Sequence, residues 1–217
     1  MRDLTPPDPP LPVGSRGEER LLSGVYVSLA FAEGALALRQ ATLCQRWGLT
    51  PRPELHLTLL YLGEIDPELL SALSEALRSL SLDWSSLVLR VTGVGAAANR
   101  EAPRLLREED ALLDAVDEHR VAWWSVEGGV ALQALRARVL SCCEGEGVSI
   151  DPARTSFFWP HLTLGSAAPD GEPWDQHVLP KEASLLREEP WPLRPSLAHI
   201  TSSKIHPQSL VSLFCWP

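Results

Sequence analysis

The stretch His56-Leu57-Thr58-Leu59 returns unchanged as His161-Leu162-Thr163-Leu164, and this repeated tetrapeptide decides the fold expected for the chain. On a β-strand, alternate side chains point to the same face. Each copy therefore presents one imidazole and one hydroxyl on one face and turns its two leucines toward a core. Two such strands, brought together, would form a cleft with paired histidines and paired threonines. Those groups suit acid–base chemistry on a phosphate ester without a metal ion.

A third His-x-Thr match lies near the C-terminus, at His199-Ile200-Thr201. The residues that follow it do not repeat the leucine pattern, and His-x-Thr on a strand face is compatible with ordinary packing. We interpret His199 as a core or rim residue. The first two copies share both leucines, so we interpret them as functional and keep coincidence as the alternative.

The same order of elements precedes both motifs, which favours two similar lobes that each supply one histidine strand. Each motif follows a strand, an amphipathic helix and a loop marked by proline. The predicted elements are strand Leu22–Phe31, helix Gly34–Trp47 and strand Glu54–Leu62 before and at the first motif, and strand Val121–Val126 and helix Val130–Cys143 before the second. The leucine spacing of the second helix predicts that Arg136 and Arg138 face the solvent.

The remaining segments complete an α+β pattern. Asp66 and Pro67 predict the start of a helix that runs to about Leu80. We expect strands at Leu87–Val94, Leu197–Ile205 and Leu210–Trp216, the last two as antiparallel neighbours. We interpret Ala96–Arg120 as a polar connector with a short helix at Glu108–His119, and residues 167–195 as a long irregular loop.

Composition limits the class of protein. A chain of 217 residues can bury one core or two small lobes that share an interface, so residues 21–217 predict a single bilobal domain. Residues 1–20 are rich in proline and charge and predict a disordered tail. No apolar run approaches the roughly 18 residues of a membrane helix, and the tail lacks the apolar segment of a signal peptide. We expect a cytoplasmic protein that does not bind membranes.

Charge and cysteine content exclude further classes. The net charge of −9 argues against broad nucleic-acid binding, although a small site for the end of a nucleic acid remains compatible with it. The four cysteines (Cys44, Cys142, Cys143 and Cys215) form no Cys-x-x-Cys pair. Neither a zinc site nor a disulfide framework is therefore expected, and we predict reduced thiols.

The paired motifs and their flanks resemble the 2H phosphoesterase superfamily, and most closely the bacterial RNA 2′,3′-cyclic phosphodiesterases of the 2′-5′ RNA ligase family. The matching stretches are Pro53–Glu64, Leu132–Val139 and Trp159–Leu164. The resemblance implies two pseudo-symmetric lobes, each an antiparallel sheet with outer helices, that enclose a central cleft. It also implies a role in RNA processing.

The resemblance and the residues together assign candidate roles. His56 and His161 are the candidate catalytic residues, and the resemblance implies that His56 donates the proton and His161 is the base. Thr58 and Thr163 would donate hydrogen bonds to the phosphate oxygens, and Tyr61 would stack on a base. No metal and no cofactor are expected.

Two positions depart from the family pattern. Family members often carry an arginine soon after each motif, where this chain has Leu60 and Ser166. Arg154 is a candidate for the missing positive charge, although an exposed loop arginine is the competing interpretation. Trp159 is equally compatible with the core and with the wall of the cleft.

The sequence predicts a monomeric, metal-independent phosphodiesterase that hydrolyses the 2′,3′-cyclic phosphate of RNA ends or nucleotides to a 2′-phosphomonoester. Two alternatives stay open. The same groups could act on 2′-5′ oligonucleotides or on an ADP-ribose cyclic phosphate. The chain could also bind nucleotides or RNA ends without efficient turnover.

Overall fold

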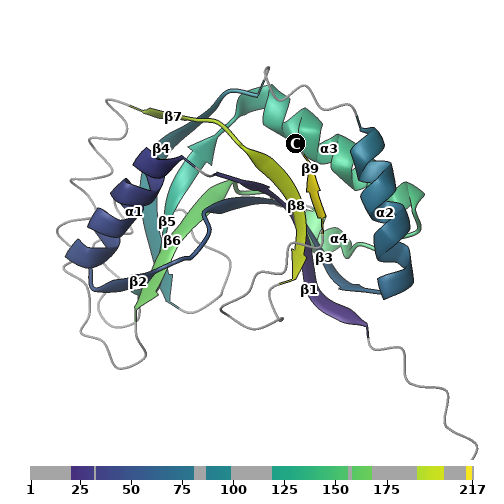
Figure 1. Ribbon diagram of the computed structural model, residues 1–217, viewed down its shortest axis with the longest axis horizontal. Helices are drawn as coiled ribbons and strands as arrows, with labels where there is room; N and C mark the ends of the chain where they lie inside the picture. Colours follow the sequence, from purple (N-terminus) through teal and green to yellow (C-terminus); the bar gives the residue numbers. More distant parts are fainter. Residues whose placement is uncertain are drawn as a thin grey trace, which may run out of the picture.

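The chain folds as one curled antiparallel sheet with helices on its outer side, in a computed structural model that describes residues 21–31, 33–80, 87–98, 119–155, 158–167, 190–202 and 214–216 (Figure 1). Within these ranges the sheet has nine strands in the order β7-β4-β5-β6-β3-β1-β8-β9, and β2 pairs with β6. The predicted α+β class is confirmed. The two expected lobes are the two halves of this sheet.

The first half of the chain follows the predicted order closely. Its elements are β1 (Leu22–Ala30), α1 (Gly34–Arg46), β2 (Leu49–Pro51), β3 (His56–Ile65) and α2 (Pro67–Ser79). The Asp66 carboxylate caps α2 by accepting a hydrogen bond from the backbone N–H of Glu68 at 2.8 Å. The predicted start of this helix is therefore confirmed, and it follows from local capping chemistry.

The second half contains two elements that the sequence did not predict, α4 and β7. Its elements are β4 (Leu89–Ala98), β5 (His119–Glu127), α3 (Gly129–Gly145), α4 (Pro152–Thr155), β6 (His161–Ala167), β7 (Trp191–Leu193), β8 (Leu197–Ser202) and β9 (Phe214–Trp216). Strands β8 and β9 pair antiparallel, as predicted.

Three predicted segment boundaries are wrong. The expected connector Ala96–Arg120 begins and ends inside strands, because β4 runs to Ala98 and β5 begins at His119. The expected loop over residues 167–195 contains β7, and three-residue β2 was also missed. Elements this short carry too few residues for a periodic signal and form by pairing with β4 and β6. The predicted tail, the rest of the connector with its helix, and most of the long loop lie outside the described residues.

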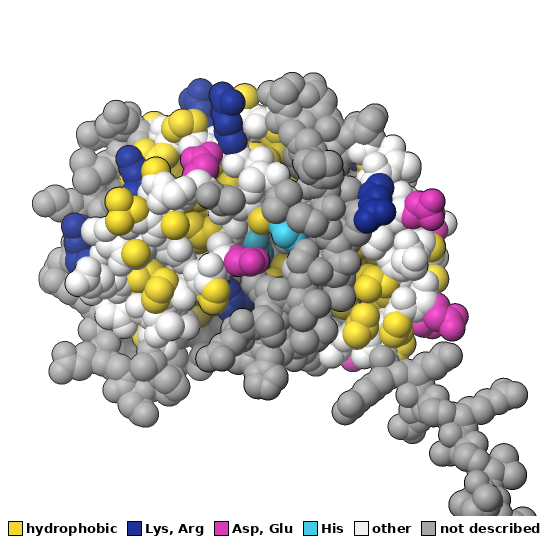
Figure 2. Space-filling model, in the orientation of Figure 1, with side chains coloured by type: hydrophobic (Ala, Val, Ile, Leu, Met, Phe, Trp, Pro, Cys, Tyr) yellow, Lys and Arg dark blue, Asp and Glu magenta, His cyan; other side chains and the backbone are white. Residues whose placement is uncertain are grey.

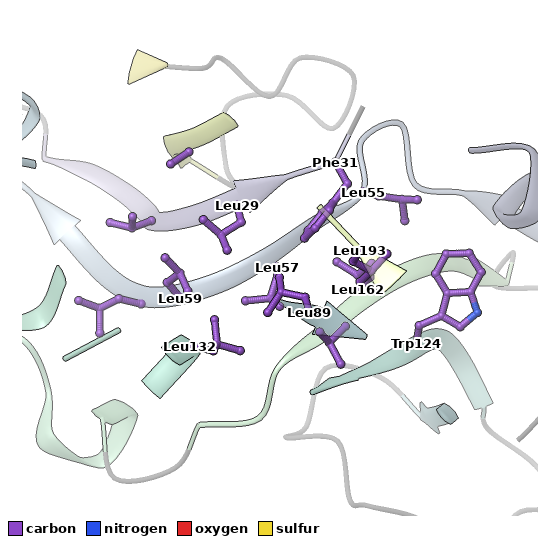
Figure 3. Close-up of a cluster of buried hydrophobic side chains, with 14 of the residues drawn as sticks. Leu29, Phe31, Leu55, Leu57, Leu59, Leu89, Trp124, Leu132, Leu162 and Leu193 are labelled. Carbon is purple, nitrogen blue, oxygen red and sulfur yellow. The ribbon is translucent and has the colours of Figure 1, made fainter. Parts of the chain in front are cut away.

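The core lies between the outer face of the sheet and the helices (Figure 3). Both motifs turn their leucines into it, as predicted: Leu57, Leu59, Leu162 and Leu164 are all buried. Helices α2 and α3 contribute buried aliphatic residues at helical spacing, namely Leu73, Leu77, Leu132, Leu135 and Val139. Full burial of a leucine side chain stabilises a protein by about 1.5–3 kcal/mol, so the motif leucines anchor the motif strands.

The two halves of the sheet meet at a narrow seam between the motif strands. Strands β3 and β6 share one register pair, Leu57 with Leu162. Away from that pair β3 follows β1 and β6 follows β5. The seam is thus where the two halves diverge. None of the described helices is long and apolar enough to cross a membrane.

Candidate active site

The seam brings both histidines and both threonines to one face of the sheet. In an antiparallel pair, the residues that flank a register pair also lie opposite each other. Pairing of Leu57 with Leu162 therefore aligns His56 with Thr163 and Thr58 with His161, although the strands diverge on either side of the leucine pair. All four side chains point away from the leucine core and are half-buried. Figure 2 shows histidine side chains (cyan) in a hollow at the centre of this face.

A backbone carbonyl two residues earlier in the chain orients each imidazole. Nδ1 of His161 lies 2.9 Å from the carbonyl oxygen of Trp159, and Nδ1 of His56 lies 3.4 Å from that of Glu54. A carbonyl oxygen only accepts hydrogen bonds, so Nδ1 is the donor in each contact. In the neutral ring Nε2 then carries the lone pair, which is the atom available for proton transfer. The 3.4 Å contact is long, and holds His56 less firmly.

Aromatic rings support both imidazoles. His56 stacks on Tyr26 of β1, with ring centroids 5.2 Å apart. His161 stacks on Trp159 at 4.9 Å, and Trp123 of β5 meets Trp159 edge-on at 4.9 Å. Trp159 is therefore part of the site and packs against its histidine. Offset stacking favours one ring orientation and keeps each imidazole in place.

Trp123 and Trp124 of β5 point to opposite faces of the sheet, as alternation along a strand requires. Trp123 pairs with Thr163 on the site face, and Trp124 pairs with Leu162 on the core face. Both are buried. A Cβ atom at Gly95 of β4 would lie 2.4 Å from the indole of Trp123, so only glycine admits this ring. Gly95 therefore lets Trp123 lie flat beside the second motif.

Burial keeps both imidazoles neutral near pH 7. Burial first, then the positive charge of Arg52 and smaller effects of His161 and His199, lower the pKa of His56 to about 4, and the hydrogen bond to Glu54 opposes the shift. Burial also lowers the pKa of His161, and its bond to Trp159 opposes that shift. A charge on His161 would lower the pKa of His56, so protonation of one ring disfavours protonation of the other.

His199, interpreted from the sequence as a core or rim residue, lies on the same face of the sheet. Ser28 of β1 pairs with Thr58 of β3 on one side and with His199 of β8 on the other. Paired residues point to the same face, so His199 lies one strand beyond the first motif. It is buried, as a packing role predicts, and its charge lowers the pKa of His56. The sequence carried no signal that β1 would separate β3 from β8.

Tyr61 lies further along the same face. It pairs with Tyr26, and a register irregularity in this part of β3 brings it to the side of Thr58. Tyr61 is half-buried. It can contact a ligand that extends along β3 beyond the histidines.

Arg136 faces the sheet and not the solvent, so the sequence prediction is wrong. Its Nε donates to the carbonyl of Leu59 at 3.1 Å, and its Nη2 donates to that of Thr155 at 2.9 Å. The guanidinium also lies over the ring of Phe158, 4.6 Å from its centroid. Apolar spacing located the buried face of α3 without revealing that this arginine lies at its border. The predicted exposure of Arg138 is confirmed.

Gln40 of α1 makes an equivalent pair of contacts on the other side of the seam. Its side-chain amide donates to the carbonyl of Arg52 at 2.8 Å and to that of Leu164 at 2.7 Å. Leu164 and Leu59 are the fourth residues of their motifs. Each helix therefore bonds the segment before its own motif and the end of the opposite motif.

Neither position after the motifs supplies a cation. Leu60 is buried and Ser166 is exposed. The side chain of Arg154 lies outside the described part of the chain. In the described ranges no group of three or more His, Cys, Asp or Glu side chains is arranged to hold a metal ion. Cys44 and Cys143 are free buried thiols whose pKa values burial raises to about 11 and about 12.

Comparison with known proteins finds a family match over part of the chain. Residues 30–106 match the family model of LigT-like phosphoesterases. A curated RNA 2′,3′-cyclic phosphodiesterase of Geobacillus stearothermophilus is 28% identical over 109 residues, which are 50% of this chain and 29% of that protein. The matched part thus spans less than a third of this relative's length.

Solved structures include a phosphoesterase that is 18% identical, covers 90% of this chain and 97% of its own, and has a TM-score of 0.51. The protein TT0787 of Thermus thermophilus is 22% identical over 85% of this chain and 91% of its own, with a TM-score of 0.49. Because the phosphoesterase structure is only 18% identical to this chain, its similarity shows a shared fold and not a shared function. The family match covers residues 30–106, which include the first motif, and agrees with the predicted resemblance to phosphoesterases.

Proposed function

We propose that the chain is a metal-independent phosphodiesterase that opens 2′,3′-cyclic phosphates of RNA ends or nucleotides and leaves a 2′-phosphomonoester. The observation that carries the proposal is the seam, because one register pair sets two half-buried imidazoles and two hydroxyls on one face. The match to LigT-like phosphoesterases and the named activity of the Geobacillus relative support the same reaction class.

The proposed reaction is an in-line displacement at phosphorus. A water oxygen forms a bond to phosphorus while the bond from phosphorus to the ribose 3′ oxygen breaks. One imidazole takes the proton from water through Nε2, and the other gives a proton to the departing oxygen. Thr58 and Thr163 donate hydrogen bonds to the non-bridging oxygens, on which charge accumulates in the transition state. Each proton transfer contributes about 10²–10⁴-fold to the rate.

The family resemblance and the pKa of His56 point to opposite assignments of the proton donor and the base. The family resemblance assigns proton donation to His56 and the base to His161. In the free protein the pKa of His56 is about 4, which favours a neutral base. A bound phosphodiester anion raises the pKa of nearby imidazoles. His56 can therefore act as the proton donor only when the bound substrate anion raises its pKa enough for the ring to be protonated. Substrates with a good leaving group should rescue the variant that lacks the donor.

Hydrolysis of 2′,3′-cyclic nucleotides in the presence of EDTA tests the proposal. We expect turnover that EDTA leaves unchanged and a 2′-monophosphate as product. A panel with 2′-5′ oligonucleotides and ADP-ribose cyclic phosphate would identify the preferred substrate. No turnover of any member would refute the enzymatic proposal.

The absence of arginine after each motif favours one competing function. Leu60 and Ser166 supply no positive charge to a phosphate, and this would suit a protein that binds nucleotides or RNA ends without efficient turnover. Tight binding of a nucleoside 2′-monophosphate, together with no hydrolysis over hours, would select this alternative.

A further inference from the structure

The proposed phosphate site needs a cation that neither motif provides. Among the described Lys and Arg residues, the charge of Arg52 helps to lower the pKa of His56. Glu54 acts on His199, which lies one strand further away. Arg52 is therefore the candidate cation for a phosphodiester held near His56. Figure 2 shows an acidic side chain (magenta) next to the histidines and a basic side chain (dark blue) below it.

Arg52 lies where the two motif strands come together. It follows β2, which pairs with the second motif strand, and precedes β3, which carries the first. Its backbone N–H donates to the carbonyl of Leu164 at 2.8 Å, so it extends the pairing of β2 with β6. The backbone of Arg52 is thus adjacent to both motifs.

The backbone at Arg52 is held firmly while its side chain is exposed. The carbonyl oxygen accepts the 2.8 Å hydrogen bond from the buried amide of Gln40. Pro51 and Pro53 on either side restrict the backbone further. The side chain of Arg52 therefore starts from a fixed backbone position next to both motifs, and its exposure makes it accessible to a ligand.

We propose that Arg52 binds the non-bridging oxygens of the phosphate and supplies the positive charge that the positions after the motifs lack. The inference rests on the proposed function, because it names the residue that would hold the phosphate in that reaction. A guanidinium presents two parallel N–H groups to two phosphate oxygens, which gives both attraction and orientation. The ligand class is a phosphodiester or phosphomonoester anion attached to a ribose.

Binding through Arg52 would also change the first motif histidine. In the free protein the positive charge of Arg52 helps to hold the pKa of His56 low. An anion paired with Arg52 compensates that charge, so the pKa of His56 rises when the phosphate binds. Arg52 would then couple substrate binding to protonation of His56.

Binding of adenosine 2′-monophosphate to Arg52→Gln tests the inference. The variant loses only side-chain donors, since both hydrogen bonds at this position use backbone atoms. We expect its Kd to be about tenfold higher than that of the parent protein, in line with the loss of a charge-assisted hydrogen bond. Arg90→Gln is the matched control, because Arg90 is an exposed strand arginine on β4. An equal effect in both variants, or none in Arg52→Gln, would overturn the inference.

A titration of His56 by NMR gives a second readout that does not depend on turnover. In Arg52→Gln the pKa of His56 should rise in the free protein, and added adenosine 2′-monophosphate should raise it less than in the parent. Arg52→Lys keeps the charge and should restore the low pKa, with partial recovery of binding. If the parent protein hydrolyses no cyclic phosphate, the proposed reaction is refuted. The binding measurement and the His56 titration would still test whether Arg52 binds the phosphate. An unchanged titration of His56 in Arg52→Gln would contradict the proposal.

Discussion

The two halves of the sheet are joined at the seam by similar contacts made with different chemistry. In the first contact, the neutral side-chain amide of Gln40 on α1 donates hydrogen bonds to the carbonyls of Arg52 and Leu164. In the second contact, the charged guanidinium of Arg136 on α3 donates hydrogen bonds to the carbonyls of Leu59 and Thr155. Each helix crosses to the opposite motif strand. The halves therefore depend on each other through two bonds that a single register pair alone would not provide.

The histidines differ between the halves in a related way. His161 has the shorter bond to its carbonyl, and its stacking partner Trp159 precedes it closely in the same chain segment. His56 has the longer bond, stacks on Tyr26 from the neighbouring strand and is subject to the charge of Arg52. The second motif is thus held mainly by local contacts, and the first by contacts from other strands. Variants that act on one half at a time can separate these effects.

The largest effect is expected from the imidazoles themselves. His56→Ala and His161→Ala should each reduce kcat by about 10²–10⁴-fold, because each variant loses one proton-transfer group. Cyclic-nucleotide hydrolysis under saturating substrate measures this loss. Full activity of either variant would refute the two-histidine mechanism, and a large loss in only one would show that the halves are not equivalent.

Loss of the charged seam contact should be the most destabilising of the structural changes. Arg136→Met removes two hydrogen bonds and leaves two carbonyls without this donor, so the free energy of unfolding should fall by about 2–4 kcal/mol. Urea denaturation measures the change. The matched control is Arg138→Met, two residues away on the exposed side of α3. Equal stabilities of the two variants would show that Arg136 does not hold the seam.

The histidine environments predict a pH dependence of stability. His56 has a folded pKa of about 4 against an ordinary 6.5, so the unfolded chain binds more protons between these values. Stability should therefore fall as the pH decreases from about 6.5 to about 4, by at most about 3 kcal/mol from this group. His56→Gln should flatten the curve measured by denaturation at several pH values. A dependence that persists unchanged in this variant would contradict the assignment.

The neutral seam contact should have the smallest effect. Gln40→Met keeps the size and apolar stem of the side chain but removes both donors, and should lower the free energy of unfolding by about 1–3 kcal/mol. Gln45→Met, at an exposed position of the same helix, is the control for helix propensity. A larger loss in Gln40→Met than in Arg136→Met would reverse the comparison between the halves.

Much of the candidate site could be predicted because its signals are local. The alternation of the repeated tetrapeptide predicts which side chains face the core, and the structure buries all four leucines. Asp66 and Pro67 predict the start of α2 through capping chemistry that needs no distant partner. The opposite faces of Trp123 and Trp124 follow from strand geometry in the same way.

Other features could not be predicted because they depend on which segments meet. The sequence pattern alone predicts that Arg136 is exposed. It contacts the seam because α3 packs on β3. His199 joins the site face because β1 lies between β3 and β8. Arg52 gains its importance from pairing of β2 with β6.

The amino-acid sequence by itself determined the α+β fold class, the two motif strands and which of their side chains face the core, since alternation along a strand is a property of the local backbone. Only the tertiary structure decided that one leucine pair joins the halves, that each helix crosses to the opposite motif, and that Arg52 lies beside the site. Those relations arise from contacts between residues far apart in the chain. Their free energies depend on packing and burial that no short stretch of sequence contains.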